Sequence, residues 1–143
     1  MDRLANFIMS LSVVTFVLVY VVDLPTLLTG ETKLVTEYYY KDFAKSFLLD
    51  IVVVGVYLVV GESIASALQL KSEVSHITCI VLTAGVISSL FYLLFSSGWR
   101  KGSFFHRWFA AVGVKAIGYD MILVGSVYST MLVLDRLIAR RLA

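Results

Sequence analysis

The chain alternates four long apolar stretches with three short polar segments. The apolar stretches cover about residues 4–24, 44–70, 74–95 and 109–134. Each is close to the roughly 20 residues that a helix needs to cross the hydrocarbon core of a bilayer. Backbone groups in lipid must satisfy one another, so we expect these stretches to be helical. The pattern predicts an all-α, polytopic membrane protein, a four-transmembrane-helix bundle that forms one transmembrane domain over residues 1–143.

Composition strengthens this prediction. Apolar residues make up 59% of the chain and the mean hydropathy is +0.90, whereas an ordinary soluble domain is roughly 45–50% apolar. The first apolar run, Leu4 to Val22, is longer than the core of a signal peptide, so we interpret it as a retained span. Four spans use nearly the whole chain. We therefore expect a multi-pass integral membrane protein with no separate soluble domain.

An even number of spans places both chain ends on one face of the bundle, here called the terminal face, and the opposite side is the loop face. Aromatic residues gather in the loop-face segments, and Lys and Arg are almost equally divided between the two faces. Amphipathic rings and basic side chains are typical of the lipid headgroup region. The residues predicted to be interfacial or lipid-contacting are Tyr38, Tyr39, Tyr40, Trp99, Arg100, Lys101, Arg107 and Trp108.

Several ionisable side chains lie inside or at the edge of the apolar stretches, where charge is costly and often functional. Asp50 and Lys115 fall at similar depth toward the loop face, and Asp23 ends the first span on that side. We predict that these three form a buried charge cluster in which Lys115 is flanked by two carboxylates. Two alternatives stay open: Lys115 can snorkel to the interface, and Asp23 beside Pro25 can simply cap the end of the span.

Glu62 and Asp120 are the predicted candidate proton or ion site. Glu62 lies in the terminal-face half of the second span with no expected cation at its depth, since His76 is closer to the membrane surface. Asp120 lies nearer the middle of the fourth span. Carboxyl groups at such depths can carry protons or ions, but interhelical polar contacts also hold bundles together. A packing or subunit-contact role is the more frequent one.

The sequence also argues against several kinds of site. A single cysteine, Cys79, excludes an intrachain disulfide and a CxxC pair. His76 and His106 are too far apart to hold a haem together, and one cysteine with two distant histidines cannot form a closed zinc site. No phosphate-binding GxxxxGK[ST] or GxSxG motif occurs. We predict no catalytic residue, no metal and no cofactor, and the dispersed net charge of +2 gives no argument for nucleic acid binding.

Four segments carry a family resemblance, and they are Asp23-Leu24-Pro25, Phe47-Leu48-Leu49-Asp50, Phe105-His106-Arg107-Trp108-Phe109 and Lys115-Ala116-Ile117-Gly118-Tyr119-Asp120. With them the chain resembles, over most of its length, small four-span membrane proteins encoded by nucleocytoplasmic large DNA viruses. The resemblance implies an inner virion membrane protein that lies beneath the capsid, and it brings no catalytic residues.

The leading prediction is a non-enzymatic structural or accessory membrane protein. Its partners would be the lipid bilayer and other membrane or capsid proteins, or further copies of itself, and a subunit of a cellular membrane complex fits the residues as well. The alternative is a small proton- or ion-coupled channel or transporter that uses Glu62, Asp120 and the pair Asp50 and Lys115. A membrane-embedded enzyme is the third possibility.

Overall fold

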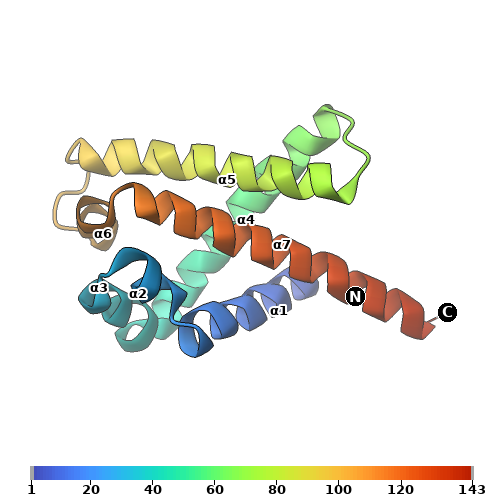
Figure 1. Cartoon of the computed structure of the whole chain (residues 1–143), viewed down its shortest axis with the longest axis horizontal. Helices are drawn as coiled ribbons and strands as arrows, with labels where there is room; N and C mark the ends of the chain where they lie inside the picture. The colour runs from blue at the N-terminus through green and yellow to red at the C-terminus, as the bar shows by residue number, and fades with distance from the viewer. Residues whose placement is uncertain (1, 143) are drawn as a thin grey trace.

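The computed structural model describes residues 2–142, which are helical nearly throughout and contain no strand (Figure 1). Four helical segments are long and apolar enough to cross a membrane. The first is α1 (Arg3–Thr15) continued by the π-helix η1 (Phe16–Val21), and the others are α4 (Phe43–Ala67), α5 (Glu73–Ser96) and α7 (Val114–Leu142). The predicted all-helical fold with four candidate spans is therefore confirmed.

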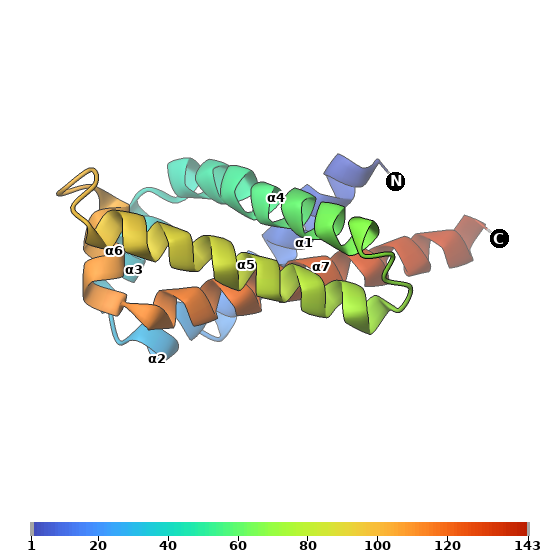
Figure 2. The ribbon, with the colours of Figure 1, turned by 90° about the horizontal axis from the view of Figure 1, so that it is seen from above.

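Short helices cover one end of the bundle. They are α2 (Leu24–Thr29), α3 (Thr32–Thr36), the π-helix η2 (Glu37–Lys41) and α6 (Phe104–Val112). Both chain ends and the turn between α4 and α5 lie at the opposite end (Figure 2). The bundle thus has the expected terminal face and loop face, and the loop face is built largely from helical turns.

Close helix contacts depend on small residues. α7 packs against both α5 and α1, and α4 packs against α5. A Cβ placed on Gly61 of α4 would lie 2.9 Å from Ile80 Cγ1 of α5, and one on Gly85 of α5 would lie 2.9 Å from Met121 Sδ of α7. The helix backbones approach as closely as they do because these positions have no side chain.

The fourth apolar stretch is divided in a way that the pattern did not predict. Gly113 adopts φ 60° and ψ −137°, a conformation that only glycine accepts readily, and it ends α6. α7 then begins at Val114, so residues 104–112 form a separate helix at the loop face and not the start of the span. At the first span, the helical path ends as Asp23 turns to φ 53°, and α2 begins at Leu24 with Pro25 in its first turn.

Candidate functional site

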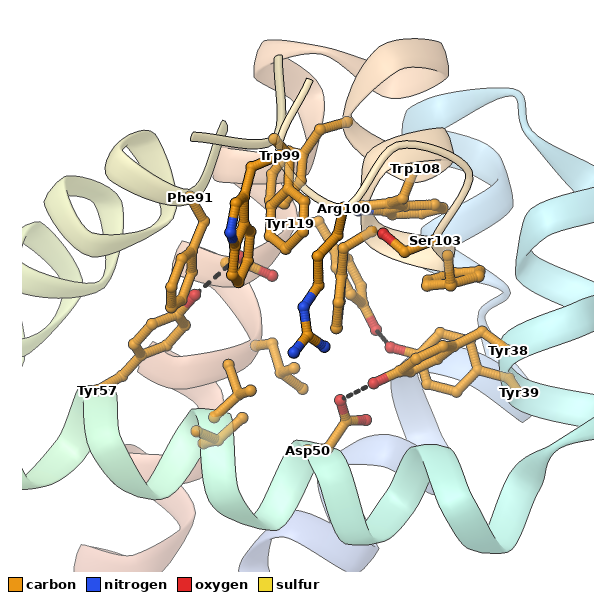
Figure 3. Close-up of a pocket in the computed structure, with 18 residues that line it drawn as sticks. Tyr38, Tyr39, Asp50, Tyr57, Phe91, Trp99, Arg100, Ser103, Trp108 and Tyr119 are labelled. Carbon is orange, nitrogen blue, oxygen red and sulfur yellow. Dashed lines mark hydrogen bonds between the residues drawn. The ribbon is translucent and has the colours of Figure 1, made fainter. Parts of the chain in front are cut away.

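The loop-face half of the bundle encloses a cavity of about 300 Å³ (Figure 3). Its walls are mostly aromatic side chains, including Phe91, Phe95, Phe104 and Trp108. Two carboxylates, Asp50 from α4 and Asp120 from α7, also line it. A small pocket with apolar walls and a few convergent polar groups is the usual form of a ligand site.

Asp50 is only 8% exposed, and its Oδ1 accepts a hydrogen bond of 2.7 Å from the Tyr38 hydroxyl of η2. Its second carboxylate oxygen accepts no hydrogen bond from residues 2–142, and it is not sealed from solvent. Burial, and next the nearby Asp50 carboxylate, raise the pKa of the Tyr38 phenol well above its ordinary value. Tyr38 therefore keeps its proton and acts as a hydrogen-bond donor to Asp50.

Asp120 is held by two donors from neighbouring helices. Ser88 Oγ of α5 lies 2.6 Å from Asp120 Oδ2, and the Tyr57 hydroxyl of α4 lies 3.3 Å from the same oxygen. Asp120 Oδ1 accepts no hydrogen bond within the part of the chain that the structure describes. Both cavity carboxylates are thus fixed through one oxygen and keep the other available.

A tyrosine pair completes the polar part of the cavity. The hydroxyl oxygens of Tyr39 and Tyr119 lie 2.8 Å apart, and the rings of Tyr38 and Tyr39 pack edge to face with centroids 4.9 Å apart. Burial and the neighbouring Tyr119 raise the pKa of the Tyr39 phenol well above its ordinary value. The phenols stay neutral, so Asp50 and Asp120 are the only acidic side chains along the cavity wall among the described residues.

Arg100 stands at the cavity mouth, on the loop between α5 and α6. Its backbone has a left-handed φ of 48°, between Gly98 at 94° and Gly102 at 85°. Figure 3 shows its guanidinium directed into the cavity on the side of Asp50. Within residues 2–142 it makes no ion pair, and its Cζ lies 5.1 Å from the centroid of the Trp99 ring.

The cavity is closed toward the terminal face. Asp120 and Asp135 occupy the same side of α7, fifteen residues apart, which corresponds to roughly 22 Å along the helix. Between them Val124 and Val127 are completely buried, as are Leu11 of α1 and Ile80 of α5. Beyond this apolar layer, Asn6 Nδ2 donates to Asp135 Oδ1 at 2.6 Å. The two polar groups are therefore separate.

The predicted charge cluster of Asp23, Asp50 and Lys115 is corrected by the structure. Asp23 and Lys115 are exposed, and no ion pair among the described residues includes any of the three. Lys115 follows the break at Gly113, and its side chain lies on the surface of α7. Asp50 accepts a hydrogen bond from the Tyr38 hydroxyl, in place of the ion pair that was expected with Lys115.

Glu62 and Asp120 do not share a site. Arg3 Nη2 contacts Glu62 Oε2, which corrects the expectation that no cation would lie at the depth of Glu62. The expectation was wrong because the long, flexible side chain of Arg3 extends along the bundle to the depth of Glu62. Only Asp120 faces the cavity.

Three residues predicted to contact lipid are buried instead. Tyr38, Tyr39 and Trp108 are 7–9% exposed and form part of the cavity wall, because the short loop-face helices fold over the bundle. Tyr40, Trp99, Arg100, Lys101 and Arg107 are exposed, and their contact with lipid stays a prediction. Arg107 donates two hydrogen bonds, of 2.8 and 2.5 Å, to the Glu37 carboxylate.

Sequence reasoning did not identify Tyr57, Ser88 and Tyr119 as site residues. One signal was available: Tyr57 follows Asp50 by seven residues, so both lie on nearly the same face of α4. No group of three or more potential metal-ligating side chains occurs among residues 2–142. Comparisons of the chain with protein-family models, curated proteins and solved structures give no match.

Proposed function

We propose that the protein is a non-enzymatic, multi-pass membrane protein that accepts a small cation into its loop-face cavity. The observation that carries the proposal is the pair of carboxyl groups of Asp50 and Asp120, which line the same cavity and each have one oxygen without a hydrogen bond from the described residues. Neither carboxylate has a basic partner within 4.0 Å among the described residues.

The cavity has the chemistry that a cation requires. Charge attraction is strong where the surroundings are apolar, and a bound cation would offset the cost of keeping two carboxylates at this depth. Aromatic faces attract cations as well, by about 0.5–2 kcal/mol per contact. Phe91, Phe95 and Trp108 provide such faces around the two carboxylates.

The closed end of the cavity favours binding over an open channel. Val124 and Val127, both fully buried, form an apolar layer between Asp120 and Asp135 along α7. A transporter would have to rearrange this layer during each cycle. Cation flux through reconstituted liposomes that Asp120→Asn abolishes would favour the transporter, whereas a binding protein should give no flux.

Tetramethylammonium is a suitable first probe for calorimetric titration of the protein in phosphatidylcholine nanodiscs. We expect one saturable site that is lost in the Asp50→Asn, Asp120→Asn double variant and weakened in each single variant. Glu62→Gln is the matched control, because it removes a carboxylate outside the cavity. Unchanged binding in a double variant that keeps its helical circular dichroism would refute the proposal, as would a native chain that binds neither tetramethylammonium nor a larger organic cation.

Membrane insertion can be tested separately by labelling with an impermeant maleimide. In a Cys79→Ser background, Lys71→Cys lies at the turn between α4 and α5, and Lys101→Cys lies in the loop between α5 and α6. If α5 crosses the bilayer, the two positions should react from opposite sides of sealed vesicles. Labelling of both from one side would contradict a span at Glu73–Ser96.

A structural or accessory role is a second candidate, favoured by the exposed aromatic and basic side chains Tyr40, Trp99 and Lys101 at the loop face. Such groups suit contacts with other membrane or capsid proteins, or with a second copy, and the resemblance to viral proteins would place the chain in an inner virion membrane. Alanine at Tyr40 and Lys101, the two of these that do not line the cavity, should then lower the oligomer mass measured by light scattering while cation binding is retained. Unchanged mass would argue against self-association through this face.

A further inference from the structure

Arg100 is the one charged side chain of the α5–α6 loop that lines the cavity, and neighbouring Lys101 does not. Arg100 reaches it from a left-handed backbone conformation that is uncommon for residues other than glycine. Its guanidinium is directed inward on the side of Asp50 without an ion pair (Figure 3). The loop therefore places a cation at the entrance to a site whose fixed charges are negative.

We infer that the cavity binds a planar organic cation, a guanidinium or amidinium group attached to a ring, and that this ligand displaces the Arg100 side chain from the mouth. The inference rests on the proposed function and adds the chemical class of the ligand. A guanidinium presents several N–H donors in one plane, so it can donate to single carboxylate oxygens, and it stacks on aromatic faces better than an ammonium group does. The free oxygens of Asp50 and Asp120 and the ring of Phe91 supply both kinds of partner.

The size of the cavity limits the ligand. A volume of about 300 Å³ holds about ten water-sized groups at roughly 30 Å³ each. Phenylguanidinium has about that many non-hydrogen atoms, and its ring can lie between the apolar walls while its charged end meets the carboxylates. Tetramethylammonium is smaller, carries no N–H donor and cannot stack as a flat group.

Arg100 and the ligand carry the same charge and occupy the same cavity, so they compete. When Arg100 occupies part of the sites, the apparent affinity for the ligand equals the intrinsic affinity multiplied by the fraction of molecules whose site is free. If Arg100 leaves the site free between half and one tenth of the time, its removal tightens binding by about two- to tenfold. If Arg100 instead contacted an anionic part of the ligand, its replacement would weaken ligand binding.

Phenylguanidinium, tetramethylammonium and benzoate should be titrated in parallel into the native chain in nanodiscs, into Arg100→Gln and into Lys101→Gln. Lys101→Gln is the matched control because it removes a neighbouring positive charge outside the cavity. We expect phenylguanidinium to bind more tightly than tetramethylammonium, benzoate not to bind, and Arg100→Gln alone to tighten the binding of phenylguanidinium by about two- to tenfold.

Several results would overturn the inference. Weaker binding of phenylguanidinium in Arg100→Gln would show that Arg100 contacts the ligand instead of competing with it. Equal tightening in Lys101→Gln would show that any nearby positive charge has the same effect. Binding of benzoate would show that the cavity accepts an anion. If tetramethylammonium binds through the two aspartates but phenylguanidinium binds no better, the inference fails and the proposed function stands. If neither cation binds, both fail.

Discussion

The hydrogen bond from Tyr38 to Asp50 should be measurable as a coupling energy between the two side chains. Both are buried, at 9% and 8% exposure, and the O–H···O distance is 2.7 Å. Hydrogen bonds to charged groups contribute about 1.5–3 kcal/mol in soluble proteins. Interhelical polar pairs in membranes give coupling energies of about 0.6 kcal/mol on average and about 1.7 at most. We expect the Tyr38→Phe, Asp50→Ala cycle to give about 1–1.7 kcal/mol, in the upper part of this range because both groups are buried.

The assay is reversible unfolding in mixed micelles at increasing denaturing detergent, with the four members of the cycle compared at one concentration. Lys115→Met combined with Asp50→Ala is the control pair, because Lys115 is exposed and forms no ion pair with Asp50. The free energies of that pair should add to within about 0.5 kcal/mol. Additivity for Tyr38 with Asp50, or coupling between Lys115 and Asp50, would refute the arrangement of the carboxylate described above.

Two further predictions concern packing and pH. Gly61→Ala should lower the free energy of unfolding by about 1–3 kcal/mol, because its Cβ would lie 3.0 Å from the Ile80 backbone Cα; Gly118→Ala, with nothing within 4 Å, should be neutral or stabilising in the same unfolding assay. The hydrogen bonds from Arg107 lower the pKa of Glu37, so their stabilising effect should be complete above the ordinary value near 4.5 and be lost as the pH falls through the lower native pKa. As the pH is lowered through this range, the melting temperature of Arg107→Gln should fall less than that of the native chain. Identical profiles of melting temperature against pH would contradict the pairing of Arg107 with Glu37.

Periodicity and length predicted the four long helices because lipid leaves an apolar stretch few alternatives to helix. They did not predict α6 as a separate helix, because Phe109 to Val112 is as apolar as the residues that follow and the break depends on one glycine, Gly113. The depth of Asp50 and Asp120 was also readable from the sequence. Their partners were not, because depth along a helix does not specify the direction in which a side chain points.

The contrast between Glu62 and Asp120 shows why depth alone is a poor guide to function. Both are carboxylates within apolar helices, yet Glu62 is reached by the flexible side chain of Arg3. Asp120 is fixed by hydrogen bonds from the short side chain of Ser88 and the rigid one of Tyr57, and it has no basic partner among the described residues. A carboxyl group that is oriented by neutral donors and lines an aromatic cavity is a suitable partner for a cation. That difference in partners makes Asp120, with Asp50, the place where ligand binding should be sought.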